Sequence, residues 1–236
     1  MNYIRKVHFK DISTEDTYLN NIPAIKGIIK NGEIAFTNAV TFFVGENGSG
    51  KSTLLDGIAA QMGFNLEGGS KNFRFSTRHK SAALEDLIVV SKSSYPKDSF
   101  YFKAESFFNA ATYIEETGVG HNYGDRSLHD QSHGERFLSL IKNRFRGNGL
   151  YLLDEPESAL SPQSQLAFLA VMSNLVEHNS QFIIATHSPI ILSYPNSTIY
   201  ELSTIGISEI AYEDSDIYSL YKGFLINPQQ FLKHLL

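Results

Sequence analysis

Residues 45–53 read Gly-Glu-Asn-Gly-Ser-Gly-Lys-Ser-Thr, and the interpretation of the whole chain starts from this stretch. Its glycines allow the backbone to curl so that successive N–H groups point at one anion. Lys51 adds a mobile cation, and the Ser52 hydroxyl is an oxygen ligand of the kind that Mg²⁺ prefers. An apolar segment precedes the stretch, and apolar residues at helical spacing follow it. The sequence therefore predicts a strand, a phosphate-binding turn and a helix whose N-terminus faces the phosphate.

These residues match the P-loop pattern, in which two glycines flank four residues and Lys-Ser comes next. A glycine-rich turn with a chance Lys-Ser is the alternative, but the expected strand before the turn and helix after it favour the P-loop. The pattern predicts ATP as ligand and Mg²⁺ as cofactor, with Lys51 at the β- and γ-phosphates. The residues expected to bind the nucleotide are Asn47, Gly48, Ser49, Gly50, Lys51, Ser52 and Thr53.

Two adjacent acids end a second apolar segment, at residues 150–156, which read Leu-Tyr-Leu-Leu-Asp-Glu-Pro. Neighbouring carboxylates are costly to bury unless cations or hydrogen bonds compensate them. Ligands of open α/β sheets bind at the carboxyl ends of the strands, which would place the two acids beside the phosphate-binding turn. We expect Asp154 to hold the Mg²⁺ shell and Glu155 to orient or deprotonate the attacking water. In isolation, an exposed acidic turn would explain the same residues.

Short apolar segments alternate with segments of helical spacing along the rest of the chain, which indicates a mostly parallel sheet covered on both faces. The expected strands are residues 3–9, 40–44, 87–90, 100–102, 150–153, 182–185, 198–202 and 207–212. The expected helices follow the phosphate-binding turn, cover residues 135–145 and 163–178, and include two short ones that close the chain, the last ending at Leu235 and Leu236. No linker divides the chain, so we expect one domain over residues 1–236.

The composition is that of a folded protein, because 42% of the 236 residues are hydrophobic. No apolar run approaches the roughly 20 residues that span a bilayer, and the first ten residues lack a signal-peptide core. The absence of cysteine excludes thiolate metal sites and a cysteine nucleophile. We therefore expect a cytoplasmic protein without direct membrane insertion. A net charge of −5 does not favour indiscriminate binding to nucleic acid.

Three further motifs follow in a fixed order. Residues 131–135 (Gln-Ser-His-Gly-Glu) open a helix, residues 158–162 (Ser-Ala-Leu-Ser-Pro) follow the two acids, and residues 186–188 (Thr-His-Ser) follow an apolar strand. Together with the P-loop and the Asp-Glu pair, this order resembles the ABC-type ATPases, whose signature motif, D-loop and switch-histidine loop occur in these places. The resemblance implies an α/β P-loop NTPase fold with a short antiparallel β portion and a helical signature region at about residues 105–146.

The resemblance also implies a head-to-tail homodimer with ATP at the interface. Ser132 and Gly134 of one subunit would contact the γ-phosphate bound by the other, and His187 would help to hold the water in line. Ser132 is also placed to cap the helix in a capping box with Glu135, and the two roles are compatible. The implied catalytic residues are Glu155, His187 and Lys51, and the implied metal ligands are Ser52 and Asp154.

The motifs depart from those of transporters at several positions. His133 and Glu135 stand where transporters usually have glycine and glutamine, and Ser161 replaces the D-loop aspartate. The Ser-x-Gly-Glu pattern is more similar to recombination, chromosome-maintenance and overcoming-lysogenization-defect ATPases, among them free-standing proteins without a long coiled coil. No clear Q-loop glutamine is found. Glu105 could replace it or could simply start a helix, and Tyr18 could stack on adenine or pack in the core.

Three functions stay open at this point. The favoured one is ATP hydrolysis that drives a soluble regulatory or nucleic-acid-associated switch. Residues 71–80 interleave basic and aromatic side chains, which suits nucleic acid but also suits a solvated loop. The alternative is the ATP-binding subunit of an ABC membrane transporter, with a separate permease. A non-hydrolysing ATP sensor is third, and the presence of both Glu155 and His187 argues against it. The sequence identifies no protein partner for any of these.

Overall fold

The computed structural model describes residues 2–10, 25, 32–66, 68–69, 87–104, 133–204, 206–233 and 235. The strands of its larger sheet are β3 (Val40–Val44), β5 (Asp98–Lys103), β6 (Gly149–Asp154), β7 (Gln181–Ala185), β8 (Thr198–Ser203) and β9 (Gly206–Ile210). Those of its smaller sheet are β1 (Ile4–Phe9), β2 (Glu33–Ala35) and β4 (Ile88–Lys92). The helices are α2 (Lys51–Met62), α5 (His133–Arg144), η4 (Pro156–Ala159), α6 (Pro162–Glu177), α7 (Pro189–Leu192), η5 (Tyr212–Asp214), α8 (Asp216–Ile226) and α9 (Pro228–Leu232).

The larger sheet has the strand order β5-β6-β7-β3-β8-β9, and only β9 runs antiparallel to its neighbour. The smaller sheet has the order β2-β1-β4 and is antiparallel throughout. The predicted fold class, a mostly parallel sheet with a short antiparallel portion, is therefore confirmed. Strand β2 and helix α7 were not expected from the sequence.

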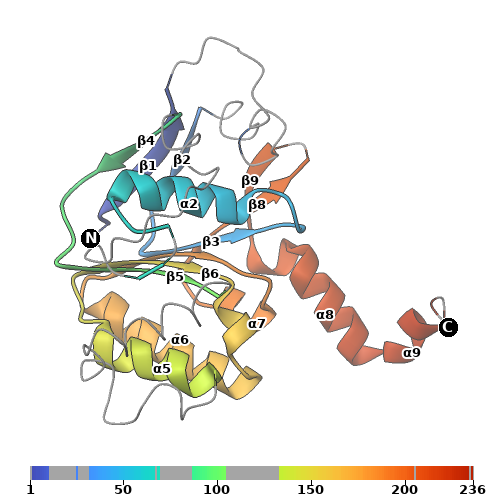
Figure 1. Ribbon diagram of the computed structural model, residues 1–236. Coiled ribbons are helices and arrows are strands. Elements are labelled where there is room, and N and C mark those ends of the chain that lie inside the picture. The colour runs from blue at the N-terminus through green and yellow to red at the C-terminus, as the bar shows by residue number, and fades with distance from the viewer. Residues whose placement is uncertain are drawn as a thin grey trace.

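Helices cover both faces of the larger sheet (Figure 1). One core lies between this sheet, α2 and the smaller sheet, and the other lies between the opposite face and helices α5, α6 and α7. Every residue of β3, β6 and β7 is buried, because strands covered on both faces need apolar side chains at successive positions. Each fully buried aliphatic or aromatic side chain contributes about 1.5–3 kcal/mol to stability.

The register of the larger sheet aligns the C-terminal ends of its central strands with one another. Asp154 at the end of β6 is paired with Lys103 on one side and with Ala185 on the other. Ala185 is in turn paired with Phe43, one residue before the end of β3. The segments that follow β3, β6 and β7 therefore leave the sheet at the same edge, which is where ligands bind in open α/β sheets.

The carboxylate of Asp98, at the start of β5, fixes the C-terminal end of α5. Arg144 Nη1 donates to Asp98 Oδ1 at 2.7 Å, and the Tyr151 hydroxyl donates to Oδ2 at 2.9 Å. The Tyr151 ring is stacked on Phe145 with 4.0 Å between the ring centroids. These contacts hold α5 against β5 and β6, and so fix the helix that opens in the signature segment.

The C-terminal helices differ from the prediction. Helix α9 ends at Leu232, whereas the sequence predicted a last helix ending at Leu235 and Leu236. The two short helices expected at the end of the chain are present as α8 and α9, which extend away from both sheets (Figure 1) and contain no buried residue. Among the described residues, no helix has the length and hydropathy needed to cross a bilayer.

Candidate functional site

The loop between β3 and α2 has a backbone that only glycine fits at two positions. Gly45 has φ 139°, and a Cβ there would lie 2.2 Å from the carbonyl oxygen of Leu202. Gly50, which precedes the first residue of α2, has φ 99° in the left-handed region. Asn47 and Gly48 lie exposed at the tip of the loop. The local sequence therefore produces the curled turn that the motif predicts, with the N-terminus of α2 behind it.

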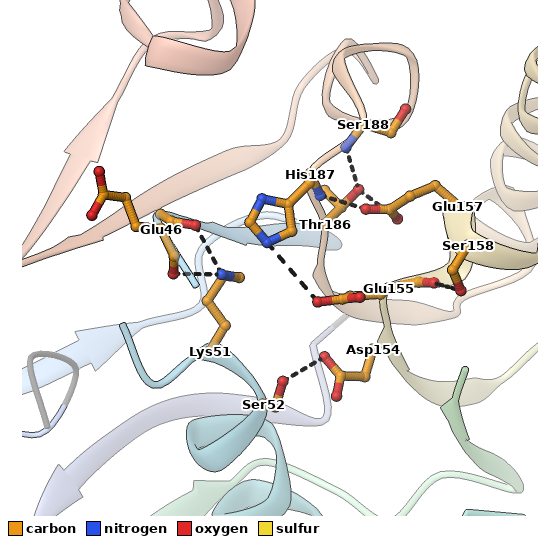
Figure 2. Close-up of polar contacts among 11 residues, drawn as sticks. Glu46, Lys51, Ser52, Asp154, Glu155, Glu157, Ser158, Thr186, His187 and Ser188 are labelled. Atoms are coloured by element: carbon orange, nitrogen blue, oxygen red, sulfur yellow. Dashed lines mark hydrogen bonds and ion pairs between the residues drawn. The ribbon is translucent and has the colours of Figure 1, made fainter. Parts of the chain in front are cut away.

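Lys51, the first residue of α2, folds its side chain into this loop (Figure 2). Its Nζ donates to the carbonyl oxygens of Gly45 at 2.8 Å and Glu46 at 3.0 Å, and the residue is only 5% exposed. Burial lowers the pKa of this ammonium, while the negative charges of Glu155, Asp154 and Glu157 act in the opposite direction. Lys51 is thus a cation held inside the loop by groups that an anion could replace.

Ser52 and Asp154 meet across the junction of α2 and β6. The Ser52 hydroxyl donates to Asp154 Oδ1 at 3.1 Å, as Figure 2 shows. Burial raises the pKa of Asp154 to about 6, although the hydrogen bond from Ser52 and the positive charge of Lys103 lower it. The two predicted metal ligands are therefore in contact, and the carboxylate is in an environment where a nearby cation would favour its charged form.

Glu155 and His187 face each other beyond Asp154. Glu155 has a left-handed backbone with φ 50°, and its N–H donates to the carbonyl oxygen of Ala185 at 3.0 Å. Its Oε1 lies 3.9 Å from His187 Nε2, which is too far for a direct hydrogen bond. That nitrogen is buried and has no hydrogen-bond partner among the described residues. Burial and then the charge of Lys51 lower the pKa of His187, so the imidazole is neutral at pH 7.

Glu157 is a third acid at the site, and the sequence analysis missed it. Its carboxylate accepts hydrogen bonds from Thr186 Oγ1 at 2.8 Å and from the backbone N–H of His187 at 2.5 Å (Figure 2). Burial raises its pKa, and these hydrogen bonds lower it. Glu157 therefore ties η4 to the histidine segment after β7. The signal was a charged residue directly after Pro156, in the one position between the acidic segment 150–156 and the D-loop segment 158–162.

Gly134 lies in the first turn of α5, against η4. A Cβ at this position would be 3.1 Å from the carbonyl oxygen of Ala159, so the helix start and η4 approach closely. Ser161 caps α6 by accepting a hydrogen bond from Ser164 N at 3.2 Å, which is a structural role for the residue that replaces the D-loop aspartate. The predictions for Ser132, Glu105, Tyr18 and residues 71–80 fall outside the described residues.

The donors and acceptors at this edge fit a polyphosphate with Mg²⁺. The Ser49 hydroxyl is buried without a hydrogen-bond partner in the described part of the chain, and it lies in the loop that Lys51 enters. Thr53 is in the first turn of α2, whose N-terminus favours negative charge. In the described ranges no cluster of three or more histidine or acidic side chains could hold a metal. Ser52 and Asp154 would therefore share an Mg²⁺ with waters and phosphate oxygens, which is how this ion usually binds.

Comparison with known proteins agrees with this geometry. The family model described as "AAA domain" matches residues 18–146, which is more than half of the chain, and a second AAA-domain model matches residues 121–193. The chain is 27% identical over 157 residues to the cytochrome c biogenesis ATP-binding export protein CcmA of Rhodopseudomonas palustris, covering 62% of this chain and 77% of that one. It is 27% identical over 173 residues to the ABC transporter G family member STR2 of Medicago truncatula, covering 64% of this chain but only 24% of that one.

The fold is also that of a solved ATP-binding subunit of an ABC transporter. The TM-score is 0.51 at 16% sequence identity, and the match covers 93% of this chain and 99% of the other. A likeness at this identity concerns the fold alone, whereas the family model covers the P-loop and the start of α5. The chain therefore belongs to the AAA-domain family of P-loop proteins and is an ATP-binding domain of the ABC ATPase type.

Proposed function

We propose that this chain hydrolyses ATP with Mg²⁺ at the edge of the larger sheet. The observation that carries the proposal is the meeting of three groups from three elements. Lys51 is the first residue of α2, Asp154 comes from the end of β6, and His187 comes from the segment after β7. No two of these are close in the sequence, yet they lie around one space that is bordered by Glu155 (Figure 2).

Each group has a distinct task in this proposal. Lys51 exchanges its two carbonyl acceptors for oxygens of the β- and γ-phosphates. Ser52 and Asp154 hold Mg²⁺, which when bound neutralises charge that develops on the phosphates. Glu155 orients the attacking water and accepts its proton, and neutral His187 donates a hydrogen bond from Nε2 to the γ-phosphate. Glu155 Oε1 and His187 Nε2 are 3.9 Å apart, so both can be within hydrogen-bond distance of one group that lies beside the line joining them.

A second subunit would complete the site. Glu46, Asn47 and Gly48 are exposed, and the Glu155 side chain is 46% exposed, so the site is open on one side. We propose that the signature segment of a second copy, with Ser132 and Gly134, covers the nucleotide in a head-to-tail homodimer. Hydrolysis then removes the phosphate that both subunits contact, and the dimer opens. ATP thus shifts the population between open and closed states by binding them differently.

The direct test combines turnover with subunit association. Glu155→Gln should lower kcat for ATP hydrolysis by about 10²–10⁴-fold, because it removes a general base, and should trap an ATP-bound dimer. Glu177→Gln changes an exposed acid at the last residue of α6 and is the matched control, with wild-type turnover expected. Lys51→Ala should abolish ATP binding in titration calorimetry. A wild-type protein that bound no Mg²⁺–ATP at millimolar concentration would contradict the proposal.

The cellular role that we propose is a soluble regulatory or nucleic-acid-associated switch. Support comes from His133 and Glu135, which differ from the transporter signature, and from the basic and aromatic residues 71–80. Filter binding with a salt titration tests the nucleic-acid version, which fails if no affinity is found at low salt.

The second candidate is the ATP-binding subunit of a membrane transporter, and the names of the relatives CcmA and STR2 support it. A pull-down with the Glu155→Gln variant and ATP separates the two roles, since partners of the closed state should accumulate. Co-purification of an integral membrane protein would favour the transporter.

A further inference from the structure

Helices α8 and α9, with Leu235 just beyond them, form an arm that the described part of the chain does not cover. Seven large apolar residues of this arm are exposed, six in the two helices and Leu235 after them, and Leu225, Ile226 and Leu235 are each more than 70% exposed. The other four are Leu220, Tyr221, Phe224 and Leu232. Apolar and aromatic residues occur on most sides of α8 (DIYSLYKGFLI), and a helix of that kind is normally buried.

The arm is nevertheless held in a defined position at its root. The Ser215 hydroxyl donates to the carbonyl oxygen of Tyr212 at 2.7 Å and caps α8 by accepting from Tyr218 N at 3.2 Å. The Tyr212 and Tyr218 rings are in contact at 4.9 Å between centroids. At the far end, the rings of Phe224 and Phe231 pack edge to face at 5.9 Å and join α9 to α8. The exposed residues are therefore presented by an ordered pair of helices.

The root also lies beside the candidate ATP site. The Tyr212 hydroxyl donates to the carbonyl oxygen of Pro189 at 2.9 Å, two residues after His187. Burial raises the pKa of Glu201, and the negative charge of Asp216, the first residue of α8, raises it further. Glu201 is paired with Val44 at the end of β3. Figure 1 shows the arm leaving the body on the side to which the β3 arrow points. The arm therefore projects from the edge of the sheet at which a second subunit would approach.

The exposed area matches what a stable dimer needs. At about 200 Å² for a large side chain, the exposed fractions of the seven residues correspond to roughly 800 Å². A standard interface buries about 800 Å² on each partner, and an isologous dimer uses the same patch on both copies. We propose that α8 and α9 of one molecule pack against α8 and α9 of a second copy of this chain, which forms a dimer in the absence of ATP.

The charges of the arm favour a second copy over a membrane surface. Residues 216–233 contain one aspartate, two lysines and no arginine, so their net charge is small. A helix that lies on a membrane needs a basic polar face opposite one apolar face. Here the only basic residue of α8 is Lys222, and apolar residues flank it on both sides along the helix. An almost uncharged apolar surface with tyrosines can pack against an identical surface without charge repulsion, and it does not attract anionic lipid.

The arm dimer would serve the ATP cycle without depending on it. Two subunits joined at their arms keep each other at a high effective concentration, so each closure of the ATP site becomes an intramolecular step. Opening after hydrolysis would then not separate the subunits. Because the pairing needs no nucleotide, Lys51→Ala protein should dimerise as well as wild type, which distinguishes failure of this inference from failure of the ATPase proposal.

Sedimentation velocity of the full chain without nucleotide tests the arm dimer. Wild type should sediment as a dimer at micromolar concentration, and the double variant Leu225→Asp with Ile226→Asp should raise the dissociation constant at least tenfold. Leu166→Asp is the matched control, because Leu166 is an exposed leucine of α6 at 59%, and it should stay dimeric. All of these positions are exposed in one molecule, so the helical content measured by circular dichroism should be unchanged in each variant.

Because the chain has no cysteine of its own, one introduced cysteine can locate the contact by forming a disulfide crosslink between two copies. Ile226→Cys protein should form a covalent dimer on mild oxidation without nucleotide, whereas Leu166→Cys protein should not. A wild type that is monomeric at every concentration would overturn the proposal, and so would a dimer that the two aspartates do not weaken. Flotation of the monomer with anionic lipid vesicles would assign the arm to a membrane surface instead.

Discussion

Asp154 shows at the scale of one residue that the candidate site lowers the stability of the empty protein. Burial raises its pKa to about 6 from an ordinary 3.8, so the folded chain holds this proton more tightly than the unfolded chain does. Its contribution to stability is therefore full below pH 3.8 and is lost as the pH rises through 6. At pH 8 the buried carboxylate costs about 1–3 kcal/mol.

Asp154→Asn should consequently stabilise the protein in the absence of nucleotide and metal. The amide keeps an oxygen that can accept from Ser52 but carries no charge to bury. We expect Tm at pH 8 to rise by about 2–4 °C for each kcal/mol gained, with no gain at pH 4, while ATP hydrolysis is lost. Thermal melts followed by circular dichroism at the two pH values measure this. If Asp154→Asn were less stable than wild type at pH 8, the predicted rise in Tm would be contradicted.

Glu157 is predicted to position His187 without contacting the nucleotide. Glu157→Gln keeps one acceptor oxygen, so only one of the bonds from Thr186 and from the His187 N–H can persist. We expect kcat to fall about tenfold with little change in KM for ATP, because the histidine is displaced while the phosphate loop is intact. Steady-state kinetics test this, with Ser197→Ala as the control, since the Ser197 hydroxyl donates to the carbonyl oxygen of Tyr194 in the segment before β8 and contacts no described residue of the candidate site. A raised KM at unchanged kcat would show that Glu157 acts on binding instead.

The sequence could predict those parts of the site that reside in local motifs. Residues 45–53 dictate the curled loop, so the positions of Lys51 and Ser52 follow from short-range geometry, and the contact of Ser52 with Asp154 follows from the strand order of such sheets. Glu157 could not be found in this way, because its role depends on a loop 30 residues later. The ATP roles of the predicted residues, including Ser132, stay predictions.

At the scale of elements, continuous apolar segments were the strongest predictors. Residues 40–44 match β3, and the expected strands 150–153 and 182–185 match β6 and β7 to within a residue, because burial on both faces favours a continuous run of mostly apolar residues in these strands. Strand β2 has three residues and helix α7 has four, which is too short for any periodicity to register. The two short helices expected at the end of the chain correspond to α8 and α9, but the sequence did not predict that their apolar residues are exposed, because apolar content alone does not show which molecule covers them.

Asp98 allows a test of how α5 is fixed. Asp98→Ala removes the carboxylate that accepts hydrogen bonds from Arg144 and Tyr151, and so breaks two of the contacts that join α5 to β5 and β6. We expect the free energy of unfolding in urea to fall by about 2–4 kcal/mol. Glu33→Ala breaks the exposed pair of Glu33 with Lys6 at 2.8 Å and is the control, with a change of about 0.5 kcal/mol or less. Equal losses in the two variants would mean that the buried pair does not anchor the helix.

At the scale of the whole molecule, the two proposed contacts between subunits have different roles. The arm would hold two copies together at all times, and the ATP site would open and close between them. Only the second contact exchanges catalytic groups, since the P-loop with Lys51 and the signature segment with Gly134 would come from different subunits. A variant in either segment should then disable a site that it shares with the other copy.

Co-expression of two inactive variants tests this exchange. Lys51→Ala removes the cation expected to bind the phosphates. Gly134→Asp adds a side chain at a position where a Cβ would lie 3.1 Å from the carbonyl oxygen of Ala159, and it brings a negative charge to the start of α5. In a head-to-tail heterodimer one site carries both defects and the other carries neither. Co-expression of the two variants in equal amounts makes half of the dimers mixed as the subunits first assemble, so we expect up to about a quarter of wild-type hydrolysis from this pool, although each variant alone is inactive. If both segments served the same subunit's nucleotide, every site would carry a defect and co-expression would restore nothing.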